Sequence, residues 1–393
     1  MKITNKYVIE AIVFLSYVLF AMAWVGGTAS LSQIMASMHV NSYASASFIS
    51  GAVTLAKILG TFIAAWFALT LGIKRAFFIA CILVVLGVIT PIAPTFDMLL
   101  ISRFLMGLGG ALMIVYFNPI VMNLFTVDQR STINGLNAVA FNVGTAIVLW
   151  FIPQINALTG DWQHSLMIFS GFSLLLAMVW YLVVLTDNEP SSMLNSPQLP
   201  SKKYGYLDGL KDNFTWIYAL SYSGLLAFYI CLFTFYPKAG ISASKWVIGF
   251  GIIGTIAGII YSKKIKQRIP IIRWSGAIQV VTVIGLSFSS SASIQTLCAI
   301  ILGFAIFFPV TALISIPHEL SAMTGEKITI IFSLFWSISY LVATIILWLF
   351  GKLIDLNHGE FGSAFVLISI VSSSLFIGSF LLPETNNNGK TLS

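Results

Sequence analysis

The sequence predicts an all-α membrane protein with twelve transmembrane helices in two halves of six. Three observations support this fold class. Of the 393 residues, 58% are hydrophobic and only 8% are charged, a balance that excludes a soluble domain with a polar surface. The mean hydropathy is +0.95. Apolar runs of about 20 residues, the length that crosses a bilayer as a helix, recur along the whole chain.

The first apolar run begins almost at the N-terminus and shows no convincing cleavage site, so we expect a spanning helix and not a removed signal peptide. The runs are separated by segments that hold most of the lysine and arginine residues. The predicted spans, in chain order, are residues 7–32, 43–70, 75–93, 96–123, 134–157, 164–186, 212–237, 245–261, 271–291, 293–316, 328–350 and 361–382.

The second span carries a lysine near its centre. Lys57 has about 13 residues of the span on each side, which places its backbone roughly 20 Å from either helix end. The side chain is too short to reach the surface, and an ammonium facing lipid costs about 2.5 kcal/mol or more. We therefore expect Lys57 to face a cavity or a polar partner. It is either a structural lysine held by neighbouring carbonyls and hydroxyls, or an anion-binding or gating charge.

The fourth span has an arginine near its external end, followed by small residues and an Asn-Pro pair. Small side chains between Gly107 and Ala111 allow another helix to approach closely, and Asn118-Pro119 predicts a local irregularity. Arg103 is shallow enough to extend toward the surface. Together these features predict a helix that lines an internal surface rather than one that only faces lipid.

One long polar segment, residues 187–211, interrupts the apolar chain and is rich in Ser, Pro, Asn and Lys. This composition is typical of a flexible linker, which we expect in the cytoplasm. The segment divides the chain into an N-terminal bundle of six spans, residues 1–186, and a C-terminal bundle of six, residues 212–393.

The two halves match each other when the numbering is shifted by 190. Phe117–Ile120 then aligns with Phe307–Val310, and the basic turn Gly72–Arg75 aligns with Ser262–Ile265. Two matches at one offset indicate an internal repeat of six plus six spans.

Lysine and arginine residues are distributed unevenly between the two sides of the membrane. An even number of spans puts both termini on one side, which carries fifteen of them, whereas the other side carries Lys238, Lys245 and Lys352. Because basic residues favour the cytoplasmic side, we expect a multi-pass protein of a bacterial inner membrane with both termini in the cytoplasm. This placement explains the net charge of +7 without nucleic-acid binding.

The chain resembles the major facilitator superfamily over its whole length. The resemblance rests on the twelve spans, the central linker, a basic turn after spans two and eight, and the Arg-x-x-x-Gly-x-Gly-Gly-Ala run that starts at Arg103. In that family the turn after span two usually carries Gly-x-x-x-Asp-Arg-x-Gly-Arg-Arg. Here Leu69 and Thr70 replace the acid and its neighbour, while the basic half, Gly72 to Arg75, remains. The ion-pair role of the turn therefore does not carry over directly.

The resemblance implies two six-helix bundles around a midplane cavity that opens alternately to either side, with spans 1, 4, 7 and 10 facing the cavity. It leaves Arg103 with two equally open roles, in substrate binding or in structure and proton handling. The Gly-Pro-x-x-Gly-Gly signature of antiporters is absent from span five, which argues against a drug/proton exporter. Thr159–Trp162 and Pro317–Leu320 are loosely similar to the cyanate and nitroimidazole permease group.

No acidic residue is expected deep inside a span, whereas two cations are. A negatively charged substrate could itself neutralise Lys57 and Arg103, so an anionic substrate is favoured. Coupling to a co-transported proton, or gating, would fall to charged residues near the span ends. These candidates are Glu10, Asp97, Lys74, Arg75 and Glu319.

Aromatic and amide side chains on the presumed cavity helices could wall a small-molecule site. Helix packing or an interfacial aromatic belt is the competing explanation. In addition to Lys57 and Arg103, the substrate-binding candidates are Tyr17, Trp24, Tyr116, Asn118, Tyr222, Tyr229, Trp336 and Tyr340.

Other functions find no support in the residue pattern. The four histidines lie near span ends rather than in a ligand-spaced cluster, so we expect no metal site. There is no Walker-type nucleotide loop, and the three cysteines fall inside apolar runs. We expect a monomer that is not an enzyme and holds no cofactor.

The sequence thus favours a secondary active transporter, a symporter that moves a small anionic or polar solute by alternating access. The alternative is a proton-coupled exporter of lipophilic drugs or metabolites, which would bind to the aromatic-rich spans. A third alternative is a non-transporting sensor or assembly protein, although no appended signalling domain is visible.

Overall fold

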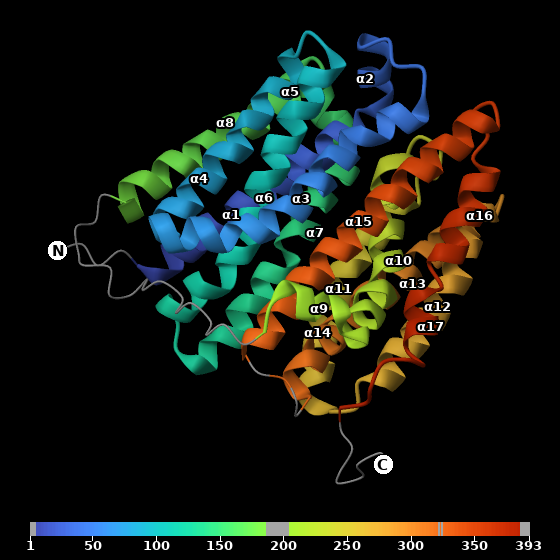
Figure 1. The fold of residues 1–393 in the computed structure, drawn as a ribbon. Helices are drawn as coiled ribbons and strands as arrows, with labels where there is room; N and C mark the ends of the chain where they lie inside the picture. Colours follow the sequence, from blue (N-terminus) through green and yellow to red (C-terminus); the bar gives the residue numbers. More distant parts are fainter. Residues whose placement is uncertain (1–4, 186–203, 321–322, 324, 386–393) are drawn as a thin grey trace. The chain divides into compact units, whose positions relative to one another are not determined.

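The computed structural model describes residues 5–185, 204–320, 323 and 325–385. Within this part of the chain the regular secondary structure is entirely helical. The chain divides at Leu199 into two compact units, and long helices make up each of them (Figure 1).

Twelve apolar helical segments confirm the predicted fold class. Eleven segments of the described chain are long and apolar enough to cross a membrane, and the shorter apolar segment Gly362–Gly378 supplies the twelfth. Four of the segments are composite. A 3-10 turn joins two helices within Ile73–Ile92, and a π-helical turn ends Trp162–Leu185. Short turns separate two helices within Ala292–Glu319 and within Gly362–Gly378.

The first unit contains the first six spans. Its elements are α1 (Lys6–Ala29), α2 (Leu31–Ser37), α3 (Tyr43–Leu71), α4 (Ile73–Val85), η1 (Leu86–Val88), α5 (Ile89–Ile92), α6 (Phe96–Leu124), α7 (Val127–Thr159), α8 (Trp162–Trp180) and η2 (Tyr181–Leu185). Side chains of Ser42, Thr95 and Asp161 accept hydrogen bonds from backbone amides and so cap the starts of α3, α6 and α8. Gly72 has a φ of 77°, which suits glycine and lets α3 turn directly into α4.

The second unit contains the other six spans. Its elements are α9 (Tyr206–Lys211), α10 (Asn213–Phe235), α11 (Ser244–Lys264), α12 (Ile269–Phe288), α13 (Ala292–Phe307), α14 (Val310–Glu319), α15 (Gly325–Leu356), α16 (Gly362–Val371) and α17 (Ser374–Gly378). Helix α10 packs along α15, and α11 packs along α13.

The predicted linker, residues 187–211, lies outside the described residues as far as position 203, and its last part forms α9. Asp212 caps α10 and forms an ion pair of 2.9 Å with Lys327 of α15. Partial burial raises the pKa of Asp212, but hydrogen bonds and the Lys327 charge more than offset this effect and leave the pKa below its ordinary value. The ion pair therefore attaches the start of α10 to α15.

Small residues on α6 bring two neighbouring helices close, as the sequence predicts. A Cβ atom at Gly107 would lie 2.7 Å from the Cα atom of Val53 on α3. A Cβ atom at Gly109 would lie 2.5 Å from the carbonyl oxygen of Ala80 on α4. Because both neighbours are backbone atoms, neither can move aside cheaply. The two glycines are therefore required for this close packing.

The second unit repeats this close contact, because a Cβ atom at Gly303 of α13 would collide with the backbone of Val247 on α11. The two units differ at the aligned prolines. Pro119 lies inside the uninterrupted helix α6, whereas Pro309 separates α13 from α14. The irregularity expected at Asn118-Pro119 is therefore not a break in the helix.

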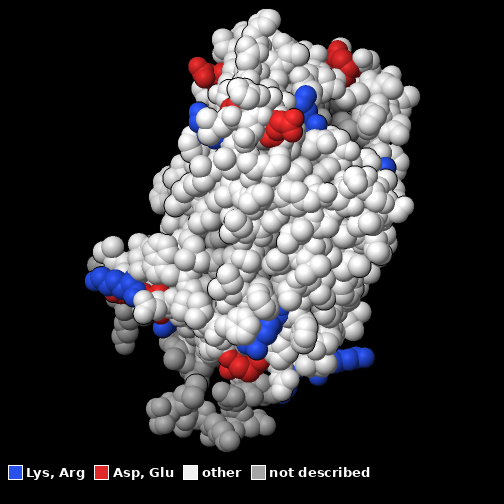
Figure 2. All heavy atoms as spheres, turned by 90° about the vertical axis from the view of Figure 1, so that its right-hand side faces the viewer, with Lys and Arg blue, Asp and Glu red and all other residues white. Residues whose placement is uncertain are grey.

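Charged side chains of the described residues gather toward two opposite ends of the face drawn in Figure 2, with a broad uncharged band between them. Large apolar side chains of the second unit are exposed, among them Val281 at 70% and Ile370 at 66%. Such extensive exposure of apolar surface is expected where a helix bundle faces lipid.

Candidate functional site

Lys57, on α3, lies inside a cage of four aromatic rings. Its side chain is buried, with 2% of the residue exposed. The Nζ atom lies 5.1 to 5.7 Å from the four ring centroids and donates a hydrogen bond of 3.3 Å to the Tyr17 hydroxyl. An ammonium near aromatic rings is stabilised by cation–π attraction. The rings of this aromatic cage belong to Tyr17, Phe20, Trp24 and Phe141.

Helices α1 and α7 provide the rings of the aromatic cage. Tyr17, Phe20 and Trp24 follow one another at intervals of three and four residues, which places them on one face of α1. Phe141 of α7 lies 6.0 Å from Tyr17 and 5.3 Å from Trp24 between ring centroids. The Trp24 indole N–H donates to the Ser50 hydroxyl of α3 at 2.9 Å. This hydrogen bond joins α1 to the helix that carries the lysine.

Arg103, on α6, is completely buried and joins three helices. Its guanidinium donates to the carbonyl oxygens of Ala23 at 2.8 Å and Trp24 at 2.6 Å on α1, and of Ile49 at 2.9 Å on α3. Although Arg103 is close enough to the helix end to reach the surface, these carbonyls hold it inside the unit. Its planar fork of donors reaches several acceptors at once, which a lysine cannot do. Arg103 thus holds α1, including Trp24, against α3.

The two acidic candidates of the first unit occupy different environments. Glu10 of α1 is 3% exposed and interacts with the Asn137 side chain of α7. Asp97 is exposed in the first turn of α6, where the helix dipole favours a negative charge. The structure therefore distinguishes a buried carboxyl group from an exposed one.

The remaining candidates of the first unit lie outside the aromatic cage. The Tyr116 hydroxyl donates to the Ala64 carbonyl of α3 at 2.9 Å. Asn118 is exposed and accepts a hydrogen bond of 3.4 Å from an asparagine of α7. Lys74 and Arg75 lie in the first turn of α4, and neither has an ion pair with a described acidic residue.

Three aromatic candidates of the second unit form one cluster between α10 and α15. The Tyr222 ring lies edge-on to Trp336 at 5.6 Å, and Trp336 stacks on Tyr340 at 6.0 Å. Tyr229 instead meets Phe307 of α13 at 5.3 Å. Such ring pairs are favourable in themselves. Packing within the unit therefore accounts for part of the aromatic pattern in the sequence.

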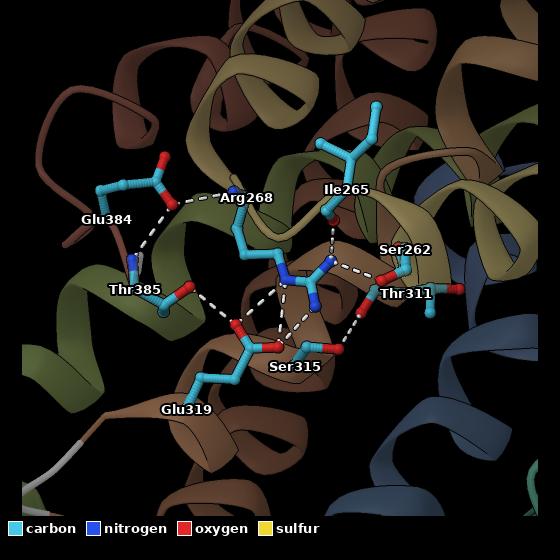
Figure 3. A network of polar contacts seen from close by, with 8 residues as sticks. All are labelled: Ser262, Ile265, Arg268, Thr311, Ser315, Glu319, Glu384 and Thr385. Carbon is cyan, nitrogen blue, oxygen red and sulfur yellow. Dashed lines mark hydrogen bonds and ion pairs between the residues drawn. The ribbon is translucent and has the colours of Figure 1, made fainter. Parts of the chain in front are cut away.

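Glu319, at the end of α14, belongs to a polar network in the second unit (Figure 3). Its carboxylate accepts hydrogen bonds from Arg268 Nη2 at 2.5 Å and Nε at 3.0 Å, and from the Thr385 hydroxyl at 2.7 Å. Glu384 accepts from the backbone amides of Arg268 at 2.8 Å and Ile269 at 3.0 Å. The network ties the start of α12 to the end of α14 and to the segment after α17.

Sequence reasoning missed several of these residues. In the sequence, Arg268 is one of several basic residues that follow the eighth span, and nothing distinguishes it from the others. No spacing pattern relates it to Glu384. Phe20 and Phe141 carry no polar group, so nothing distinguishes them from other core aromatics. The only available signal is that Phe20 lies between Tyr17 and Trp24 at helical spacing.

Comparison with known protein families gives one match over most of the chain. The model of the Major Facilitator Superfamily matches residues 13–344. An uncharacterized protein of Campylobacter jejuni is 28% identical over 58% of this chain and 69% of its own length. A major facilitator superfamily transporter of Mycoplasma pneumoniae is 24% identical over 63% of this chain and 50% of its own length.

Solved structures with the same fold include transporters. The inward-open xylose transporter XylE from E. coli superposes with a TM-score of 0.77 at 14% identity, covering 98% of both chains. A bacterial homologue of the human lysosomal transporter Spinster, inward-facing and occupied, gives a TM-score of 0.66 at 16% identity, with 97% of this chain and 95% of the other covered. At these identities the similarity extends to the fold.

Proposed function

Because the chain belongs to the Major Facilitator Superfamily, we propose that it is a secondary active transporter that moves a small anionic or polar solute by alternating access. We infer the solute class from the Lys57 ammonium, which is buried in the first unit and surrounded by the aromatic cage. An ionisable group at this depth in a spanning helix marks a functional site by default.

The chemistry of the aromatic cage supports an anionic or hydrogen-bonding solute. The ammonium attracts a carboxylate or a similar anion and can donate hydrogen bonds to it. The rings exclude water, which strengthens these interactions. A cationic solute would be repelled by Lys57 unless another group compensated its charge. Arg103 acts as a structural cross-link in this proposal, since its donors hold α1 and α3 together through backbone carbonyls.

The same proposal includes a neutral polar solute as the second possible substrate class. One solved structure of similar fold is described as a proton:xylose symporter bound to 6-bromo-6-deoxy-D-glucose. A hydroxyl group of a sugar can accept a hydrogen bond from an ammonium, and the sugar ring can lie against aromatic side chains. Xylose is therefore a suitable neutral probe beside small anions.

We place the protein in a bacterial inner membrane with both termini in the cytoplasm. The support is the distribution of fifteen basic residues on that side against three on the other. In this orientation the Arg268–Glu319 network lies at the cytoplasmic end of the second unit, and Lys57 lies in the interior of the first.

Solute exchange in proteoliposomes tests the proposal. Purified protein would be reconstituted and assayed for counterflow of radiolabelled small carboxylates, inorganic anions, amino acids and xylose. We expect Lys57→Ala to weaken the affinity for the transported solute roughly ten- to hundredfold, the effect of losing a hydrogen bond to a charged group. Lys57→Arg keeps the charge and should retain part of the affinity.

Lys352→Ala is the matched control, because Lys352 is an exposed lysine of α15. It should leave counterflow unchanged. An affinity that is the same in wild type and Lys57→Ala would contradict the binding role of Lys57.

A lipophilic exporter is the alternative, and the aromatic cluster of Tyr222, Trp336 and Tyr340 supports it. In that case the binding surface would be apolar, and the charge of Lys57 would contribute little to the affinity for the exported solute. Export of a lipophilic dye that persists in Lys57→Ala and is lost in Trp336→Ala would favour this alternative.

A further inference from the structure

The turn between α11 and α12, together with the start of α12, carries a group of positive charges. Four basic side chains form this cationic patch, which we define as Lys263, Lys264, Lys266 and Arg273. The three lysines are exposed, and none has an ion-pair partner among the described residues. Arg273 is partly exposed. Like charges so close in sequence repel one another, and an anionic ligand would relieve this repulsion.

The two acidic side chains of the neighbouring polar network do not neutralise the patch. Glu319 binds the guanidinium of Arg268, and Glu384 accepts hydrogen bonds from the backbone amides of Arg268 and Ile269. Glu384 already occupies the N-terminus of α12, so a further anion would bind to the side chains of the patch instead. Five basic residues against two acidic ones leave this region with a net positive charge.

The same network fixes the backbone that carries the lysines (Figure 3). Arg268 donates to the carbonyl oxygens of Ser262 at 3.0 Å and Ile265 at 2.8 Å. These two carbonyls lie on either side of Lys263 and Lys264 in the chain. A ligand of the patch would therefore order lysine side chains but not the turn itself, which lowers the entropic cost of binding.

Arg273 lies inside the span and not in the turn. It is the fifth residue of α12, about 6 Å from the helix start, which corresponds to the headgroup region of roughly 5–8 Å on each side of a bilayer. Its guanidinium carbon lies 4.1 Å from the ring centroid of Phe380, and its Nε and Nη2 atoms lie 3.4 and 3.3 Å from oxygens of Ser379. These contacts hold the guanidinium between α12 and the segment after α17. Its Nη1 group has no hydrogen-bond partner among the described residues.

Large apolar side chains continue from the patch along α12 and α17. Trp274 is 71% exposed and Phe380 is 58% exposed, and aromatic rings of this kind are enriched at the membrane–water interface. The exposed apolar side chains deeper in the two helices are Ile278, Val281 and Ile377. A ligand that contacts both the charges and this surface needs an anionic head and apolar chains.

The aligned positions of the first unit carry no equivalent patch. With the numbering shifted by 190, Lys266 corresponds to Ala76 and Arg273 corresponds to Leu83. Only Lys264 has a basic counterpart. Because the first unit forms the same turn between spans without these charges, the repeated fold does not require them.

We propose that the cationic patch binds the phosphodiester headgroup of an anionic phospholipid whose chains lie along α12 and α17. Ammonium and guanidinium groups form charge-assisted hydrogen bonds with phosphate oxygens, and the Nη1 group of Arg273 is an available donor. In the proposed orientation this lipid belongs to the cytoplasmic leaflet. The site itself does not depend on which solute the protein transports.

Lipid titration of the full-length protein in a neutral detergent at low salt tests the site. Native mass spectrometry would measure the affinity for dioleoyl-phosphatidylglycerol, with zwitterionic dioleoyl-phosphatidylcholine as the lipid control. We expect wild type to prefer phosphatidylglycerol. Each basic residue near a membrane surface contributes about fivefold to the binding of anionic lipid. The double variant Lys263→Gln/Lys264→Gln should therefore lower the affinity roughly twenty- to thirtyfold, and Arg273→Gln about fivefold.

Two further variants separate the site from net charge and from misfolding. Lys238→Gln/Lys352→Gln removes two exposed lysines elsewhere in the second unit and should keep the wild-type affinity for phosphatidylglycerol. Arg273→Lys keeps the charge and should retain most of that affinity. Thermal unfolding without added lipid should give the wild-type melting temperature for the lysine variants, because exposed charges without ion-pair partners contribute little to stability.

Three results would overturn the proposal. Equal affinities of Lys263→Gln/Lys264→Gln and Lys238→Gln/Lys352→Gln for phosphatidylglycerol would show that net charge alone attracts the lipid. Equal binding of phosphatidylglycerol and phosphatidylcholine by wild type would show that the anionic headgroup is not recognised. Displacement of phosphatidylglycerol by an equal concentration of inorganic phosphate would assign the patch to a soluble anion instead of a lipid.

Discussion

At the scale of single residues, the two buried cations of the first unit have different surroundings despite similar sequence contexts. Arg103 donates to three backbone carbonyls from two neighbouring helices. Lys57 faces aromatic rings and a tyrosine hydroxyl. The rigid guanidinium suits a fixed cross-link, whereas the flexible ammonium suits a ligand that comes and goes. Of the two, Lys57 is the better candidate for solute binding.

Arg103 should therefore affect stability more than affinity. Arg103→Ala leaves three carbonyls without this donor and should lower the free energy of unfolding by about 1–3 kcal/mol. Thermal unfolding of the purified protein would measure the loss, and solute affinity of the remaining folded protein should stay within about threefold of wild type. Lys266→Ala, an exposed change in the second unit, is the control. A large loss of affinity with normal stability would assign Arg103 to the binding site instead.

At the scale of elements, α6 shows why small residues cluster on one span. Gly107 and Gly109 bring its backbone against α3 and α4, and this contact sets where Arg103 reaches α1 and α3. In the second unit, Gly303 brings the backbone of α13 against α11 in the same way. Helices in lipid gain little from the hydrophobic effect between themselves, so close backbone contact is a main source of their association.

A single methyl group on α6 should disturb this packing. Gly109→Ala places a Cβ atom 2.5 Å from the Ala80 carbonyl oxygen, which forces α4 away and should cost about 1–3 kcal/mol. Gly171→Ala on α8 is the matched control, because a Cβ atom there meets nothing within 4 Å, and it should be neutral or slightly stabilising through helix propensity. Equal melting temperatures for the two variants would contradict the packing role of Gly109.

At the scale of the whole molecule, the two units repeat one helix arrangement but differ in their charges. The second unit has the Arg268–Glu319 ion pair and the Asp212–Lys327 ion pair. In the described part of the first unit, no lysine or arginine pairs with an acidic side chain, and its acid Glu10 is buried beside Asn137. The repeat therefore supplies a common scaffold on which each half carries its own polar groups.

The orientation of the molecule is tested by labelling from one side of the membrane. In a variant with Cys81, Cys231 and Cys298 replaced by serine, Lys264→Cys should react with an impermeant maleimide only in inside-out vesicles, and Glu360→Cys only in intact cells. Both original side chains are exposed. The reverse pattern would show that the fifteen basic residues face outward and would contradict the proposed topology.

The sequence by itself determined the all-α class, the twelve spans and the close-packing face of α6, because these depend on composition and local spacing. It also identified Lys57 and Glu319 as charges of interest. Only the tertiary structure decided what surrounds them, since Phe141 and Arg268 reach these residues from helices distant in sequence. The same holds for Arg103, whose direction depends on carbonyls that α1 and α3 present only after packing, and for Glu10, whose burial depends on α7.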